Sequence, residues 1–315
     1  MNLFLYQLKQ AFLSLKQNPG FVFSIVSTMG ITLGALLCIL TLTYVMLVKP
    51  LPYPEQDKLY VVEHNYITEE NNIDFSAFPY PSLIHFYQKQ NIFNQTAIIA
   101  YEENILTSLD NQPALHTGYV SPEWFSLLGA TFTLGRGFEA TEALNTDNPV
   151  AILSYNTWVN EFNQDMDILT KTVTFNDVHF RVIGVLNADF IEPQIHGLGL
   201  KTSVWLPWDF NSSKSMSTTW FSVGGNLALL GALKDNVSVM QAEQNLTLLI
   251  NETWRENVSN IEFYNGWQIG VTTKSIQQIM TGSSKKHTYL LLVGVIGLVI
   301  IAFINIAALQ PSNNY

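Results

Sequence analysis

Two long apolar stretches bracket a segment in which apolar and polar positions follow strand and helix periods. The first, Phe21–Val48, has 28 residues without a formal charge, and the second, Thr288–Leu309, has 22 residues interrupted only by Asn305. As a helix, the first stretch is about 42 Å long, against about 30 Å for the hydrocarbon core of a bilayer. The pattern predicts transmembrane helices at residues 21–48 and 288–310, and large residues before Lys49 argue against a cleaved signal peptide.

The first twenty residues have a different pattern. Their apolar side chains fall roughly on one helical face, which predicts an amphipathic helix lying on the membrane over residues 1–20. The positive charges are almost balanced, with Lys9, Lys16 and the amino terminus on one side and Lys49, Lys285 and Lys286 on the other. The amphipathic helix therefore decides the expected orientation: residues 1–20 and the tail 311–315 are cytoplasmic, and residues 49–287 are extracytoplasmic.

The central segment alternates between strand and helix signals, which predicts a mixed α/β domain. Ser238 with Gln241 forms a capping box ahead of an apolar helical face, and Asn176-Asp177 joins two strands of a hairpin over Thr172–Leu186. Ser121 is the expected N-cap of a helix that stops at Gly129. Further expected elements are a helix at Pro79–Gln90 and strands at Asp57–His64, Asn226–Leu233 and Gly266–Thr273.

Composition and charge support this division. Only 13% of the 315 residues are charged, well below the roughly 25% typical of soluble domains. All 25 Asp and Glu residues lie between Glu55 and Glu262, whereas 12 of the 15 Lys and Arg lie between Leu51 and His287, so the central segment has a net charge of −13. Such a segment repels nucleic acid and anionic lipid headgroups, so nucleic acid is excluded as a partner.

No motif for nucleotide, dinucleotide or metal chemistry stands out. The chain has no GxxxxGK[ST] phosphate loop, no GxSxG or HExxH motif, and Gly197-Leu198-Gly199 lacks the third glycine of a dinucleotide site. The six histidines are scattered, and the lone Cys38 cannot form an intrachain disulfide. We expect no enzyme activity, no catalytic or metal-binding residue and no cofactor bound by this chain.

Small residues in the two apolar stretches are the strongest candidates for function. Gly30 and Gly34 form a small-xxx-small face, and Gly294, Gly297 and Asn305 fall along one stripe of the second stretch. Small residues let helix backbones approach closely, and an intramembrane amide needs a partner. Two interpretations stay open: packing of the two helices within one chain, or packing between subunits that shift against each other.

The chain resembles the N-terminal half of a MacB-like (FtsX-type) ABC transporter permease along nearly its whole length. Short motifs carry the resemblance, each weak alone but all in the family's order: Asn18–Phe21 (NPGF), Pro50–Pro54 (PLPYP), Phe78–Pro81 (FPYP), Val120–Phe125 (VSPEWF), Leu134–Phe138 (LGRGF), Pro149–Tyr155 (PVAILSY), Val182–Val185 (VIGV), Val204–Pro207 (VWLP) and Asn305–Ala307 (NIA).

The resemblance implies a fold and an assembly. Two transmembrane helices would bracket a periplasmic core domain over residues 49–287, with a porter-like part at about 55–126 and 215–280 and an inserted subdomain at about 127–214. A dimer with a second permease copy or homologue would work with a separate ABC ATPase subunit, which binds the ATP, and with a periplasmic adaptor, in the bacterial inner membrane. Pro50, Pro52 and Pro54 would end the first helix and launch the domain rigidly, so that ATP-driven motion serves export or efflux.

Two further expectations concern the chain end and an alternative function. Permeases of this kind continue into two more transmembrane helices, so a chain that ends at Tyr315 is either a split permease or a fragment of a longer one. The alternative function is a membrane sensor, because two helices bracketing an extracytoplasmic ligand-binding domain are also the layout of receptor kinases. A neighbouring gene for an ATPase or for a kinase would discriminate between them.

Overall fold

The structure, a computed structural model, describes residues 19–45, 49–68, 70, 73–197, 199–282 and 284–309. The amphipathic helix predicted over residues 1–20 therefore lies almost wholly outside the described residues, as does the tail 311–315. The chain divides into two compact units. One comprises Met1–Pro50 with Thr281–Tyr315, and the other is Leu51–Met280.

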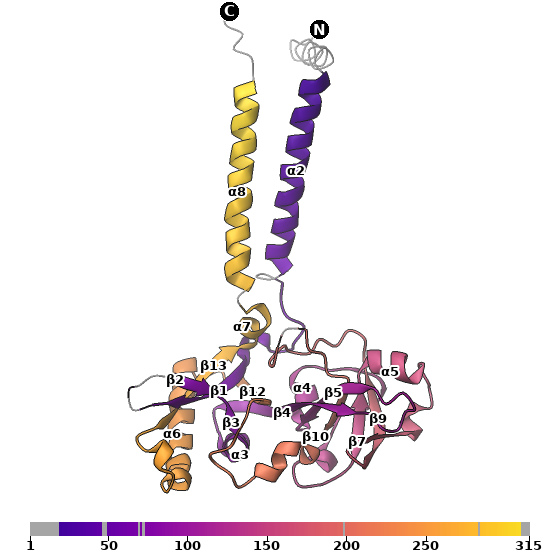
Figure 1. Cartoon of the computed structure of the whole chain (residues 1–315), viewed down its shortest axis with the longest axis vertical. Helices are drawn as coiled ribbons and strands as arrows, with labels where there is room; N and C mark the ends of the chain where they lie inside the picture. Colours follow the sequence, from indigo (N-terminus) through magenta and orange to yellow (C-terminus); the bar gives the residue numbers. More distant parts are fainter. Residues whose placement is uncertain are drawn as a thin grey trace, which may run out of the picture. The chain divides into compact units, whose positions relative to one another are not determined.

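Two helices make up the first unit. Helix α2 is Pro19–Thr43 and helix α8 is Ser284–Leu309, and they lie side by side and antiparallel (Figure 1). In α2 the hydroxyl groups of Thr28, Thr41 and Thr43 donate to the carbonyl oxygens four residues earlier, at 2.8, 2.8 and 2.7 Å. These polar groups are thus satisfied inside the helix, as a lipid environment requires.

The two helices differ as candidate membrane spans. Val22–Thr43 is long and apolar enough to cross a membrane. In α8, the apolar helical stretch among the described residues, Tyr289–Ile301, is shorter than a span requires. The second transmembrane helix therefore stays a prediction.

The second unit is built on a sheet of eleven strands in the order β13-β1-β12-β4-β5-β10-β7-β9-β6, with β2 beside β1 and β8 beside β9 (Figure 1). Its strands are β1 (Leu59–Ile67), β2 (Ile73–Ser76), β4 (Phe93–Ile105), β5 (Ala114–Val120), β6 (Phe132–Gly135), β7 (Val150–Leu153), β8 (Thr172–Phe175), β9 (Val178–Leu186), β10 (Val204–Pro207), β12 (Leu227–Leu233) and β13 (Gln268–Ser275). The short strands β3 (Phe78–Pro79) and β11 (Val223–Gly224) pair separately.

Two groups of strands meet in this sheet. Strands β6 to β10 come from the predicted insertion at residues 127–214, and the other strands come from its flanks. The groups join where β5 and β10 pair in parallel, with Val204 opposite Thr117 and Pro207 opposite Val120. Because the sheet runs through this seam without a break, the boundaries at 127 and 214 stay a prediction.

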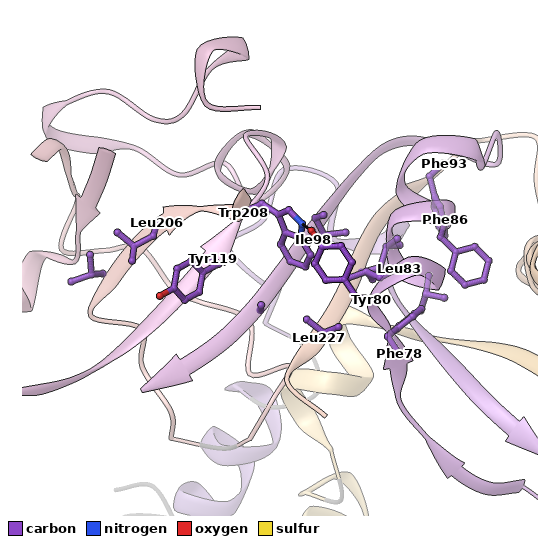
Figure 2. Packing of buried hydrophobic residues seen from close by; sticks show 14 of the residues in the cluster. Phe78, Tyr80, Leu83, Phe86, Phe93, Ile98, Tyr119, Leu206, Trp208 and Leu227 are labelled. Carbon is purple, nitrogen blue, oxygen red and sulfur yellow. Dashed lines mark hydrogen bonds between the residues drawn. The ribbon is translucent and has the colours of Figure 1, made fainter. Parts of the chain in front are cut away.

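Both faces of the sheet are buried, because successive side chains of a strand point to opposite faces. In β4, Ile98 and Ala100 join one cluster of buried residues, whereas Ala97 and Ile99 join the other. The first face is covered by helices α3 (Tyr80–Lys89), α5 (Tyr155–Phe162) and α6 (Val239–Val258). Figure 2 shows part of this core, with Leu83 and Phe86 of α3 near Phe78 and Phe93. The second face is covered by α4 (Glu123–Leu127), α7 (Ile276–Thr281) and residues near the start of the unit.

Several local predictions are confirmed. Ser238 and Gln241 form the capping box of α6, and Ala242, Leu246 and Ile250 are buried along its inner face. The β8–β9 hairpin turns at Asn176 and Asp177, whose φ angles are 49° and 61°, as a two-residue turn of this class requires.

The prediction for Ser121 is wrong. Pro122 occupies the N-cap position of α4, and the Ser121 hydroxyl instead accepts the backbone N–H of Ile98 at 3.2 Å. A neighbouring strand thus takes the oxygen that would have capped the helix.

Helix α6 also protects the edge of the sheet. Strand β13 is an outer strand, and three side chains spaced four residues apart on α6 accept its outward N–H groups. Glu243 accepts from Thr273 (2.8 Å), Thr247 from Val271 (3.0 Å) and Asn251 from Ile269 (2.9 Å). An exposed edge would offer these donors to a strand of another chain, so the helix protects this edge against aggregation by strand pairing.

Candidate functional site

The glycines singled out in the sequence lie free along their helices. A Cβ atom added at Gly30, Gly34, Gly294 or Gly297 would meet no described atom within 4 Å beyond the helix's own neighbouring backbone. Helices α2 and α8 therefore do not pack closely on each other through these glycines, and a role in contacts with other chains stays a prediction. Asn305 lies in α8, but its side chain is outside the description.

The segment Pro50–Pro54 contains a buried residue that the sequence pattern did not single out. Pro50, Pro52 and Pro54 are exposed, whereas Tyr53 between them is only 5% exposed. Tyr53 belongs to the core on the second face of the sheet, together with Leu59 and Ile276. The tyrosine, and not the prolines alone, anchors the start of the domain.

The residues that enter and leave the Leu51–Met280 unit lie next to each other. The Tyr53 hydroxyl is 4.0 Å from the Met280 sulfur, although the two residues are 227 positions apart. The backbone N–H of Gln194 donates to the same sulfur at 3.4 Å. We call this group of Tyr53, Tyr101, Glu192, Gln194 and Met280 the junction.

Pro54 packs directly against Gly129, the residue that ends the turn after α4. Gly129 has a φ of +65°, and a Cβ atom there would lie 2.7 Å from the Pro54 Cγ. Only glycine satisfies both conditions, because other residues are strained at this φ and would clash. The stop predicted at Gly129 is thus also the place where the entering chain is held.

A covering loop, residues 187–203 without the undescribed residue 198, completes the junction. Glu192 accepts the backbone N–H of Thr202 at 2.9 Å and its hydroxyl at 2.7 Å. Gln194 accepts the N–H of Gly199 at 2.7 Å and donates to the Leu200 carbonyl at 3.2 Å. These bonds close the loop on itself and hold Gln194 against Met280.

The environment of the junction disfavours charge on its polar groups. Burial raises the pKa of Glu192, and the hydrogen bonds from Thr202 only partly offset this effect. Burial, and then the nearby Glu192, raise the pKa of Tyr101 and of Tyr53 above the usual tyrosine value. His196, whose pKa is lowered by burial, stacks on Tyr101 with ring centroids 5.2 Å apart. The arrangement suits holding chain segments together more than proton transfer.

Within the described residues, no group of three or more His, Cys, Asp or Glu side chains could hold a metal ion. The sequence signal for the junction is weak, because Tyr53, Tyr101, the Glu192/Gln194 pair and Met280 are 48 to 227 residues apart and no spacing links them. Among the junction residues, only Tyr53 lies in one of the family motifs, Pro50–Pro54. The one feature of the covering loop that stands out in the sequence is Gly197-Leu198-Gly199.

Comparisons with known proteins agree on one family. Residues 24–249 match the sequence family described as the MacB-like periplasmic core domain. The chain is 28% identical over 137 residues to the macrolide export ATP-binding/permease protein MacB of Salmonella paratyphi A, a match that covers 44% of this chain and 20% of that protein. The matched region thus spans about a fifth of the length of this relative.

Solved structures also match. A domain of a putative permease protein from Porphyromonas gingivalis superposes with a TM-score of 0.53 at 14% identity, over 72% of this chain and 92% of that one, which shows a shared fold. The periplasmic region of MacB from Actinobacillus actinomycetemcomitans gives a TM-score of 0.46 at 16% identity, over 70% and 90% of the two chains.

Proposed function

Because the chain belongs to the family of the MacB-like periplasmic core domain, we propose that it is a permease subunit, or the N-terminal half of one, of a MacB/FtsX-type ABC transporter. In this proposal a separate ATPase subunit hydrolyses ATP, and the helices carry the resulting motion to an extracytoplasmic domain. The chain lies in the bacterial inner membrane, with residues 49–287 in the periplasm, and the transport direction is export.

The junction is the observation that supports this function best. Chain connectivity makes Leu51 continuous with the segment after α2, and Met280 continuous with the segment before α8. Tyr53 and Met280 lie 4.0 Å apart within one core. A displacement of either helix end therefore pulls on a single place of the domain, from which the eleven-stranded sheet transmits it as a rigid body.

The partner test uses the full-length chain. We expect an affinity-tagged copy, purified from its native membrane in a mild detergent, to bring down a polypeptide with a phosphate-binding GxxxxGK[ST] motif. Recovery of a histidine kinase in its place would favour a sensor, and recovery of neither would contradict the permease proposal. Met166→Ala, which truncates an exposed side chain far from the helices in sequence, is the control variant for the coupling test that follows.

The coupling test uses Tyr53→Ala in the assembled complex. Removing the anchored ring frees the entering chain from the core, so we expect the ATPase subunit to remain bound while ATP-dependent changes in the domain are lost. Protease accessibility of the covering loop, with and without ATP, measures this. An unchanged ATP response in a folded Tyr53→Ala complex would contradict the proposed route.

A further inference from the structure

A cavity of about 550 Å³ opens on the first face of the domain, and none of the residues that line it belongs to the junction. One wall is a single face of α3, with Tyr80, Ile84, His85 and Gln88 at helical spacing. Residues 214–220 and the last turn of α6 form the opposite wall. This volume lies within the range of small-molecule sites, which occur preferentially where parts of a protein meet.

The charges at the cavity are already paired. The Lys214 ammonium lies 2.9 Å from the Asp147 carboxylate and 3.7 Å from that of Asp209. Asp209 also accepts the backbone N–H groups of Asn145, Thr146 and Asp147 at 2.8, 2.9 and 3.0 Å. A charged ligand would have to displace one of these partners, and the acidic central segment repels anions in addition. The cavity therefore favours an uncharged ligand.

Aromatic rings and uncharged polar groups supply the remaining surface. The partly exposed indole of Trp220 lies edge-on to the His85 ring, with centroids 6.4 Å apart. Tyr80 is fixed from behind by Trp208, whose indole N–H donates to the Tyr80 hydroxyl at 2.9 Å (Figure 2). Tyr80 is buried and fixed in place, so the partly exposed Trp220 supplies the accessible aromatic surface.

The uncharged polar side chains of His85, Gln88 and Asn257 help to line this cavity. Burial, and then Lys89, lower the pKa of His85, so its imidazole is neutral at pH 7. The buried His85 Nε2 atom has no hydrogen-bond partner among the described residues. The exposed Gln88 and Asn257 add amide groups at the rim. The Asn257 Nδ2 group already donates to the Thr253 carbonyl at 2.8 Å, which leaves its amide oxygen free within the described part of the chain. A purely apolar ligand would cover this oxygen and the Gln88 amide without giving them a partner, which costs free energy.

We propose that this cavity binds an uncharged carbohydrate, a mono- or disaccharide. A pyranose ring has an apolar face of C–H groups that packs on an aromatic ring such as Trp220. Its hydroxyl groups donate to and accept from amide and imidazole groups, and it brings no charge. The cavity takes residues from the predicted insertion, such as Asn145 and Lys214, and from its flanks, so a bound sugar also contacts both parts of the domain.

The experiment uses the full chain in a detergent with a polyoxyethylene headgroup, because maltoside detergents would themselves compete. Maltose, cellobiose and N-acetylglucosamine are the probes, and saturation-transfer NMR with tryptophan fluorescence reports binding. We expect saturable binding of at least one sugar. Trp220→Ala should abolish it, whereas Trp267→Ala, which removes another partly exposed indole outside the cavity, should leave it unchanged.

Two further variants keep the test decisive if Trp220→Ala does not fold. Gln88→Trp places a large side chain at an exposed position of the wall and should block the cavity without disturbing the core. His85→Phe keeps a ring but removes the nitrogens, so we expect affinity to fall up to about tenfold, the effect of one hydrogen bond.

Absence of saturable binding of all three sugars would overturn the proposal, as would binding that persists in Gln88→Trp. Binding of indole in preference to the sugars would also overturn it. The outcome does not depend on whether an ATPase subunit associates with the chain.

Discussion

At the scale of single residues, two buried polar side chains have opposite surroundings: one is hydrogen-bonded and the other is packed among aromatic rings. Glu142 is 1% exposed, and its carboxylate receives the Arg136 guanidinium at 3.1 and 3.2 Å and the backbone N–H of Glu139 at 2.8 Å. His64 is equally buried in β1 but is surrounded by the rings of Tyr66, Phe78 and Phe86. A carboxylate with this many donors can stay charged, whereas a histidine among aromatic rings must stay neutral.

The buried histidine predicts a pH dependence of stability. Burial lowers the pKa of His64 to about 3, below the value of about 6.5 in an unfolded chain. The unfolded state then binds the extra proton, so this contribution is fully present above pH 6.5 and is lost as pH falls toward 3. At about 1.4 kcal/mol per pKa unit, we expect a loss of about 2 to 5 kcal/mol, measured by denaturant unfolding at a series of pH values.

His64→Phe, which keeps a ring at the position, should remove this part of the pH dependence. His179→Gln changes an exposed histidine and is the matched control. The carboxylates contribute equally to both proteins and cancel in the difference. Equal slopes for the wild type and His64→Phe between pH 6.5 and 3.5 would show that His64 is not held neutral.

At the scale of elements, helices act both as cover and as edge protection. Helix α6 buries one face against the sheet and offers Glu243, Thr247 and Asn251 to the outer strand β13. The capping box and the apolar face of α6 were evident from sequence. The edge contact was not, because no local pattern indicates which strand a polar side chain will meet.

Thr247→Val tests the edge contact with a side chain of the same shape. The N–H of Val271 loses its acceptor, so we expect a loss of about 1 kcal/mol in the free energy of unfolding. Amide exchange at Val271 should accelerate with it. Thr253→Val on the same helix is the control, because its side chain does not meet β13 through a described hydrogen bond; an equal effect of both variants would argue for helix propensity alone.

The glycine face of α2 gives a second prediction at this scale. Gly30 and Gly34 are open in the single chain, so we expect Gly34→Leu to weaken association between subunits by forcing helix backbones apart. Cross-linking in the membrane and ATP-coupled activity of the proposed transporter are the measurements. Leu33→Ile on the same helix is the control, and unchanged assembly of Gly34→Leu would show that this face contacts only lipid.

At the scale of the whole molecule, one sheet joins segments that the sequence separates. The strands of residues 127–214 and those of their flanks share the seam between β5 and β10, and both groups contribute to both buried clusters. A continuous sheet with shared cores unfolds cooperatively.

We therefore expect the Leu51–Met280 unit to unfold in one transition within the full chain. Thermal unfolding followed by far-ultraviolet circular dichroism and by tryptophan fluorescence should give the same midpoint. The buried tryptophans sample both sides of the seam, with Trp254 on α6 and Trp158 on α5. Two separated transitions would show instead that the insertion is an independent domain.

The sequence by itself determined what depends on neighbours along the chain. Periodicity and turn chemistry predicted the long apolar helix α2, the Asn176-Asp177 hairpin, the capped helix α6 and strands β1, β12 and β13, and ordered short motifs indicated the family. These features follow from backbone geometry and local hydrogen bonds, which neighbouring residues set.

Only the tertiary structure decided how distant residues meet. It placed Tyr53 against Met280 with Glu192 and Gln194 beside them, paired β5 with β10 and formed the open cavity between α3 and residues 214–220. Contacts across so many residues arise from the burial of both faces of one sheet. That burial depends on the summed packing of the whole domain, so no local pattern encodes it.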